Sequence, residues 1–271
     1  MPSDKKQNPL AKFLEKLGRG TVERVEEIGH CGALAAESVF WLVAGRKYSQ
    51  PVRLRSIFAQ MMEIGIHAIP IIVAMAAAIG VMLAIQGIYT LKIFGAESRV
   101  TVGIAFSMVR EFASLITGIL VAGRSGSALA ARLGTMKISQ EIDALHVMGV
   151  NPVRFLVAPA MLAMVIMVPA LTFLSMVVGL FAAGLYVGAD LSISMAAYID
   201  DVTTILSVDD VTQGLGKSAI FAVLIAVIGV VNGAGVTGGA EGVGKVTTRA
   251  VVQSIAAIVI TDMLFAFLVT R

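Results

Sequence analysis

Residues 155–189 read FLVAPAMLAMVIMVPALTFLSMVVGLFAAGLYVGA and contain no Asp, Glu, Lys or Arg. A helix needs about 20 apolar residues to cross the core of a bilayer, so this stretch is long enough to span one. Two further stretches, 64–91 and 218–240, are also free of charged residues. Over the 271-residue chain, 57% of residues are hydrophobic and 14% are charged, whereas soluble domains carry about 25% charged residues. The sequence therefore predicts an all-α membrane protein.

The hydrophobic stretches predict about five transmembrane helices. We place them at about 64–91, 100–123, 155–187, 213–236 and 250–270. Pro159 and Pro169 lie in the third stretch, which exceeds one span, so it is expected to be kinked or to begin in the interface. Residues 1–60 form an N-terminal segment and residues 61–271 the transmembrane domain. In the N-terminal segment, apolar residues recur at helical spacing between Lys and Arg, which predicts an amphipathic helix in the membrane interface or packed on the protein.

The loop charges predict the orientation. Residues 1–56 hold ten Lys and Arg, and the expected loop 124–154 holds four more, whereas 188–212 holds five Asp and neither Lys nor Arg. Positive loops stay in the cytoplasm, so the N-terminus and the 124–154 loop are predicted to be cytoplasmic. Five spans then place the C-terminus outside.

Glycine and metal-binding patterns give no enzyme site. Gly233, Gly235 and Gly238 fit G-x-G-x-x-G, but they end a membrane-length run and lack a βαβ unit. Residues 239–245 resemble a P-loop, but Val246 stands where a Ser or Thr must bind Mg²⁺. We expect helix-packing glycines instead, at Gly229/Gly233 and Gly235/Gly239. Three scattered histidines and the single Cys31 predict neither a metal site nor a disulfide.

Two charged residues fall in the middle of the second span. Arg110 and Glu111 each cost at least a few kcal/mol there unless they face protein, water or a polar ligand. Adjacent helix residues point about 100° apart, so the two cannot neutralise one another on one face. Lys217 and Asp262, in the fourth and fifth spans, are candidate partners. We favour a functional role for Arg110 and Glu111 and a structural one for Asp262; a purely structural network is the alternative.

The 124–154 loop carries a second signal. Ile138, Ile142 and Leu145 recur at i, i+4 and i+7, and Gly149 and Pro152 end the pattern. A short amphipathic helix between two spans must bury its apolar side against the membrane or a partner.

Several segments resemble the MlaE/YrbE permeases, the membrane subunits of ABC transporters that work with MCE-domain proteins. The segments are AGRSGSALAARLGTMK at 122–137, EIDAL at 141–145, MGVNP at 148–152, Pro159, Arg110-Glu111, and GVGKVTTRAVV at 242–252. The likeness covers roughly residues 60–271. The chain departs from the family pattern at Phe112-Ala113-Ser114, Arg132, Gln140-Glu141 and Ala160.

The resemblance implies a homodimeric permease in the bacterial inner membrane that moves phospholipid between that membrane and a periplasmic MCE-protein system and maintains outer-membrane lipid asymmetry. It implies cytoplasmic ABC ATPase subunits that bind the ATP, so the chain itself would be neither an enzyme nor a cofactor protein, and a STAS-like accessory protein is a further candidate partner. The implied lipid contacts are Arg110, Glu111, Lys217, Leu83, Leu91 and Phe94. The implied ATPase contacts, on a cytoplasmic coupling helix at about 131–149, are Met136, Ile138, Glu141, Ile142 and Leu145.

Two other functions fit the same composition. A secondary transporter or channel could use Arg110 and Glu111 for ion coupling, although such folds commonly carry inverted repeats and none is found here. A membrane scaffold that only assembles partners is the other. Nucleic-acid binding is not expected, because the basic residues sit at the ends of apolar segments and form no aromatic-studded face.

Overall fold

The computed structural model describes residues 29, 32–34, 36–38, 40–41 and 53–269. In this part of the chain every regular element is helical. The elements are α2 (Leu54–Ile64), η1 (Ile66–Ala68), α3 (Ile69–Ile93), η2 (Glu97–Arg99), α4 (Val100–Phe106), η3 (Ser107–Phe112), α5 (Ala113–Val121), η4 (Ala122–Gly126), α6 (Ser127–Ile138), α7 (Glu141–Val147), η5 (Val153–Val157), α8 (Ala158–Leu191), α9 (Met195–Ile205), α10 (Val208–Ala234) and α11 (Gly239–Val269). The predicted interfacial helix lies almost wholly outside the described residues.

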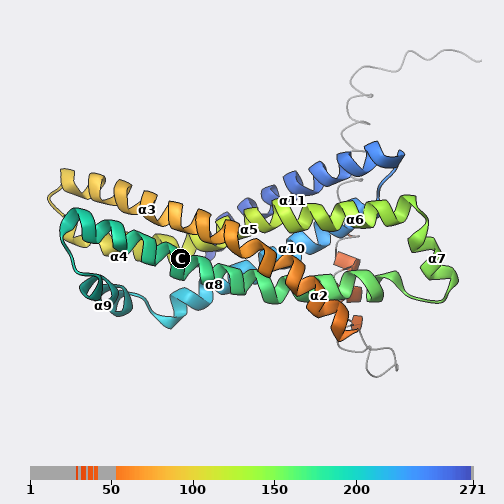
Figure 1. Ribbon diagram of the computed structural model, residues 1–271, viewed down its shortest axis with the longest axis horizontal. Coiled ribbons are helices and arrows are strands. Elements are labelled where there is room, and N and C mark those ends of the chain that lie inside the picture. The colour runs from red at the N-terminus through yellow and green to blue at the C-terminus, as the bar shows by residue number, and fades with distance from the viewer. Residues whose placement is uncertain (1–28, 30–31, 35, 39, 42–52, 270–271) are drawn as a thin grey trace, which may run out of the picture.

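The prediction of five spans is confirmed. Five helical stretches are long and apolar enough to cross a membrane: Leu54–Ile93, Glu97–Ile138, Val153–Leu191, Val208–Ala234 and Gly239–Leu268. They run along one long axis, with α7 at one end of the bundle and α9 at the other (Figure 1). The chain is therefore a multi-pass membrane protein.

The longest single helix, α8, contains Pro169 in its interior and Pro159 in its first turn. Proline is tolerated at a helix start because the first N–H groups have no acceptor within the helix. The 34 residues of α8 span about 51 Å at 1.5 Å per residue, more than the ~30 Å of the hydrocarbon core. This helix must therefore tilt or extend beyond the core.

The expected 124–154 loop is wrong in its extent. The second helical stretch continues through Arg124 and Arg132 to Ile138, so only 139–152 connects it to the third, with α7 inside that connection. Arg124 and Arg132 lie on helix, because a long spanning helix carries its basic residues past the apolar core before it ends.

Small residues bring the helices together. Gly80 of α3 and Gly179 of α8 lie close together. A Cβ on Gly80 would collide with the Gly179 carbonyl oxygen, and one on Gly179 would collide with the Met108 side chain and lie 3.3 Å from the Ala76 carbonyl oxygen of α3. Helices α3 and α8 share the most extensive contact in the fold. Gly229 and Gly233 of α10 lie against α6 and the residues before it: a Cβ on Gly233 would lie 2.8 Å from the Ala130 carbonyl oxygen. The packing role predicted for this pair is confirmed.

The role predicted for Gly235 and Gly239 is wrong. A Cβ on Gly235 would meet only its own helix, and one on Gly239 would meet nothing within 4 Å. Gly239 has φ +70°, a left-handed conformation that glycine adopts without strain. It serves the turn between α10 and α11.

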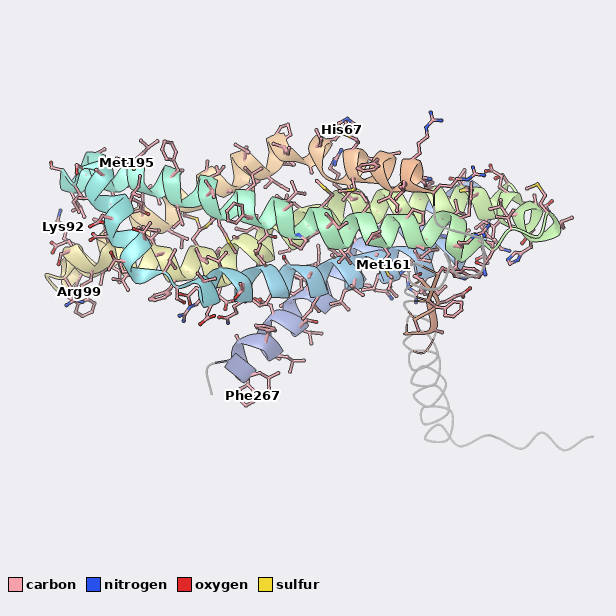
Figure 2. All side chains as sticks on the ribbon, turned by 90° about the horizontal axis from the view of Figure 1, so that it is seen from below. His67, Lys92, Arg99, Met161, Met195 and Phe267 are labelled. Carbon is pink, nitrogen blue, oxygen red and sulfur yellow. The ribbon has the colours of Figure 1, made fainter. Side chains whose placement is uncertain are left out.

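The last helix diverges from the bundle. Figure 2 shows α11 leaving the other helices, with Phe267 near its far end and away from them. Apolar side chains along it are exposed, namely Val252, Val259, Ile260, Met263, Leu264, Phe267 and Leu268. This face would meet lipid or another protein.

Candidate functional site

The second span contains two short π-helical segments, η3 and η4. In a π-helix the hydrogen bond reaches five residues back, which widens the turn, and such segments occur frequently at functional sites. Arg110 and Glu111 are the fourth and fifth residues of η3 (Ser107–Phe112). The segment thus carries the two charges that the sequence singles out.

Arg110 pairs with Asp210 at the start of α10. Its Nε and Nη2 lie 2.7 and 2.6 Å from Asp210 Oδ1. The other carboxylate oxygen of Asp210 accepts from the backbone N–H and hydroxyl of Ser207, both at 2.8 Å, which completes a capping box at the N-terminus of α10. Arg110 is also 4.2 Å from the centroid of the Phe106 ring, within the range of a cation–π contact.

Lys217 joins Glu111 to the last helix. Its Nζ lies 2.6 Å from Glu111 Oε2 and 2.8 Å from Asp262 Oδ1. The Lys217 side chain is completely buried, and an ammonium in that position is tolerated only with such partners. The structure thus confirms Lys217 as the partner of Glu111. The expectation that Asp262 partners a charge of the second span is wrong, because its carboxylate contacts Lys217 instead.

The face of α10 that meets η3 explains how both pairs form. Asp210, Gly214 and Lys217 follow one another at i, i+4 and i+7, so they lie on the same side of the helix. A Cβ on Gly214 would lie 2.5 Å from the Val109 carbonyl oxygen. The missing side chain therefore lets α10 approach η3 closely enough for its two charged neighbours to reach Arg110 and Glu111.

The five charged residues differ in exposure. Asp210 and Lys217 are 6% and 0% exposed, whereas Arg110 and Glu111 are 43% and 39% exposed. With every group ionised, three carboxylates face two cations. The arrangement holds Arg110 and Glu111 from one side while part of each side chain stays open to a ligand.

Three apolar residues predicted to contact lipid lie in different surroundings. Leu83 packs half-buried against the cluster that contains Val109. Leu91 packs against a separate cluster around Tyr198, and Phe94, in the turn after α3, is 76% exposed. Leu83 is thus near the charges, and within one chain Leu91 and Phe94 lie towards the end of the bundle that holds α9.

The predicted coupling residues divide into two groups. Met136, Ile142 and Leu145 pack against the main core, whereas Ile138 and Glu141 are exposed. The single amphipathic helix expected from Ile138 to Leu145 is wrong, because Gln140 has φ +60° and separates α6 from α7. Ser139 spans this break by donating from its hydroxyl to Glu141 Oε1 at 2.8 Å.

Three residues of these sites are not found by sequence reasoning. In the sequence, Asp210 appears as one of five acidic residues in an outer loop. Two signals could have identified it: Ser207 three residues earlier fits a capping box, and Lys217 lies seven residues later. Val147 and Met148, at the end of α7, are 89% and 66% exposed. Apolar side chains that open to water at the tip of a bundle mark a contact surface.

Metal ligands do not gather in the described part of the chain, where no three His, Cys, Asp or Glu side chains could hold one ion. The two cations and three carboxylates around η3 are arranged instead as ion pairs.

Comparison with known proteins identifies relatives over most of the chain. The family model for permease MlaE matches residues 57–268. A probable ABC transporter permease of Synechocystis sp. is 36% identical over 80% of this chain and 82% of its own length. One from Rickettsia conorii is 30% identical over 94% and 96%. The intermembrane phospholipid transport system permease protein MlaE of Haemophilus influenzae is 30% identical over 90% and 92%.

Proposed function

The chain belongs to the MlaE permease family, and on that premise we propose that it carries phospholipid between the inner membrane and a periplasmic MCE-protein system. In this role it is the membrane subunit of an ABC transporter, and its work maintains the lipid asymmetry of an outer membrane. A relative of similar length is named for intermembrane phospholipid transport. ATP is hydrolysed by separate cytoplasmic subunits.

The observation that carries the proposal is the partial exposure of the Arg110 and Glu111 side chains. Asp210 and Lys217 hold them from the protein side, while each remains more than a third exposed. A guanidinium binds phosphate through charge-assisted hydrogen bonds. Asp210 already pairs with this guanidinium and competes with the phosphate for it, and the nearby Glu111 carboxylate repels the phosphate; both effects favour release. Leu83 lines the acyl-chain side near these charges, and Leu91 and Phe94 extend it towards the periplasmic end.

Retained lipid and protein yield, measured together, test this proposal. The substitutions are Arg110→Ala, Glu111→Ala and Lys217→Ala in the purified complex. Arg110→Ala and Glu111→Ala should keep normal yield and lose bound phospholipid or transport, because both side chains are partly exposed. Unchanged lipid and transport in both variants would refute the site, and poor yield in both would favour a structural brace.

The proposed assembly is a homodimer with two ATPase subunits, a periplasmic MCE ring and a STAS-like accessory protein. The exposed apolar face of α11 gives the second copy a surface to cover. Co-purification separates this assembly from a secondary transporter, which would bring down neither an ATPase nor an MCE protein.

The ATPase contact is proposed at α7 and its flanks. Since Ile142 and Leu145 pack partly on this chain's own core, charging either of them would perturb folding as well as docking. Val147→Glu and Met148→Glu are cleaner tests, because both side chains are exposed. Loss of the ATPase with the permease dimer intact would support docking there, and full ATPase activity in both variants would refute it.

The orientation is proposed with α7 and the N-terminus in the cytoplasm and α9 in the periplasm. These helices lie at opposite ends of the bundle (Figure 1), and the acidic residues of 188–212 surround α9. In a Cys31→Ser background, a cysteine at Lys137 should react only from the cytoplasm and one at Ser194 only from the periplasm. The reverse pattern would refute the orientation and the docking site together.

A further inference from the structure

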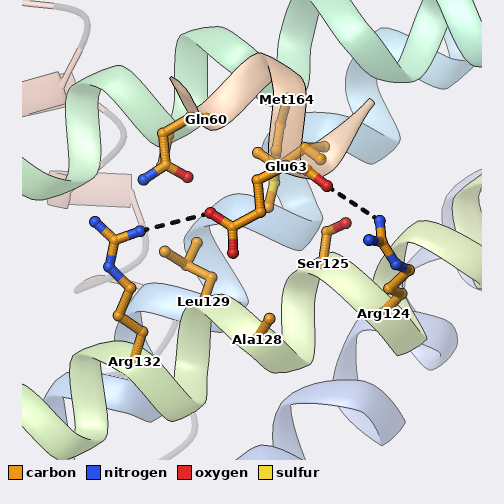
Figure 3. A pocket seen from close by; sticks show the side chains of 10 residues that line it. Gln60, Glu63, Arg124, Ser125, Ala128, Leu129, Arg132 and Met164 are labelled. Atoms are coloured by element: carbon orange, nitrogen blue, oxygen red, sulfur yellow. Dashed lines mark hydrogen bonds and ion pairs between the residues drawn. The ribbon is translucent and has the colours of Figure 1, made fainter. Parts of the chain in front are cut away.

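A second polar site lies in the half of the bundle that carries α7, apart from the charges on η3. It is a pocket of about 140 Å³ between α2, α8 and the helix from η4 into α6. Its lining includes Gln60, Glu63, Arg124, Ser125 and Arg132 (Figure 3). Nine residues of α5 separate η4 from η3, which is about 14 Å along the helix. The two sites therefore lie at different depths.

Two arginines of the pocket contact Glu63, one at its carboxylate and one at its backbone carbonyl. Arg132 Nη1 is 3.9 Å from Glu63 Oε2, a loose ion pair, and Arg124 Nη1 donates to the backbone carbonyl of Glu63 at 3.1 Å. With its amide turned so that oxygen faces the guanidinium, Gln60 accepts from Arg132 at 2.8 Å. Each guanidinium carries five N–H donors, so most of them remain available. The pocket has a surplus of one positive charge.

A buried hydroxyl in the same pocket has no partner within the described residues. Ser125 is 6% exposed, and its Oγ makes no hydrogen bond. Ser127, two residues later, donates to backbone carbonyls at Gly123 and Arg124. Leaving a buried polar group unpaired costs free energy, and a ligand oxygen in the pocket would give the Ser125 hydroxyl an acceptor.

We propose that this pocket binds a phosphate group. Two guanidinium groups and a serine hydroxyl supply the donors that phosphate oxygens accept from, and the net positive charge selects an anion. A cavity holds one water in about 10–15 Å³, so 140 Å³ accommodates a phosphate with a few waters.

The surroundings point to a phosphate carried by a membrane lipid. Leu54, Phe58 and Met62 recur at i, i+4 and i+8 on the outer face of α2 and are exposed. Gln60 and Ile64 of the same helix face the bundle and are buried. Apolar side chains thus cover the outer side of the helix that walls the pocket, which is typical of a helix that faces a membrane interface. Free phosphate shares the recognition chemistry.

The test uses the full chain extracted from phosphatidylcholine nanodiscs that contain phosphatidylglycerol, with native mass spectrometry counting the phosphatidylglycerol retained. Arg132→Gln should lower its affinity about tenfold or more, since it removes one charge-assisted hydrogen bond, and Ser125→Ala should lower it severalfold. Lys137→Gln, which removes a cation from the same helix outside the pocket, is the matched control and should retain the lipid. Arg132→Lys should restore part of the affinity.

A parallel arm adds inorganic phosphate at millimolar concentration. Displacement of phosphatidylglycerol from wild type would identify free phosphate as an occupant; resistance to displacement would identify the lipid. Equal retention in wild type, Arg132→Gln and Ser125→Ala, with no effect of phosphate, would overturn the proposal, as would an equal loss in Lys137→Gln. Arg110→Gln should leave this lipid bound, which separates the pocket from the transport site.

Discussion

The two π-helical segments of the second span widen the helix in the same way, but the side chains around them carry net charges of opposite sign. In η3, Arg110 and Glu111 each have a partner on α10, and the five charges sum to one negative. In η4, Arg124 lies next to Ser125, whose hydroxyl has no partner in the part of the chain that the structure describes, and the pocket carries one net positive charge. Each widened turn therefore presents polar side chains. Contacts with the neighbouring helix determine whether these side chains already have hydrogen-bond or ion-pair partners. Substitution of the buried α10 partners of η3 should therefore mainly cost stability, whereas substitution at η4 should mainly cost ligand.

Lys217→Ala should have the largest effect. It leaves Glu111 and Asp262 without the cation that holds them, and breaking a buried ion pair by removing one partner costs about 3–5 kcal/mol. Unfolding of the detergent-solubilised protein by sodium dodecyl sulfate measures this loss. Lys137→Ala removes an exposed pair with Asp143 and should cost no more than about 0.5 kcal/mol. Equal losses in the two variants would end the claim that η3 is the braced site.

Gly214→Ala should come next. The added methyl collides with the Val109 carbonyl oxygen and with Met176, and overpacking of this kind costs about 1–3 kcal/mol. Gly216→Ala is the matched control on the same helix, since nothing lies within 4 Å of its added Cβ. A larger loss for Gly216→Ala in the same unfolding assay would show that close approach of α10 is not what forms the two pairs.

Arg110→Gln should have a smaller effect on stability, about 1 kcal/mol. Asp210 keeps its two bonds from Ser207, and the Arg110 side chain is partly exposed. Retained phospholipid at the transport site should fall about tenfold or more because the guanidinium contact is lost. Arg110→Lys keeps the charge without the fork of donors and should recover only part of it. Full lipid retention in Arg110→Gln would reduce η3 to a structural brace.

Arg132→Gln at the second pocket should change the free energy of unfolding by no more than about 0.5 kcal/mol relative to wild type. Its side chain is half-exposed, and its ion pair with Glu63 is long. A stability loss as large as that of Lys217→Ala would show that the η4 pocket is a brace like η3, and the contrast between the two segments would disappear.

Sequence patterns predict the spans well because hydrophobic length is a local property. The charge-free stretch 155–189 predicts a single spanning helix, and α8 fills it. Arg110, Glu111 and Lys217 are found in the same way, since a charge inside an apolar run requires a partner. The predicted start of the connection after the second span is wrong, because Arg124 and Arg132 are basic residues of the kind found in loops. In the structure the helix continues through both residues to Ile138.

Contacts between residues far apart in the chain are what the sequence does not predict. Asp210 appears as one more acid beside α9, and only the packing of α10 on η3 shows that it holds Arg110. The coupling region is misread because its apolar spacing fits one helix, while a left-handed Gln140 divides it in two. Which of its apolar residues face a partner then depends on the core beneath, and Val147 and Met148 are identified only from their exposure.

The second span has a mechanical consequence. One helical rod of 42 residues, Glu97–Ile138, runs from the turn after α3 to the break before α7, about 63 Å at 1.5 Å per residue. A rigid helix carries displacement along its axis, so a push on α7 reaches both charge sites through the same backbone. The two widened turns interrupt the regular α-helical hydrogen bonding of that path where Arg110 and Arg124 lie.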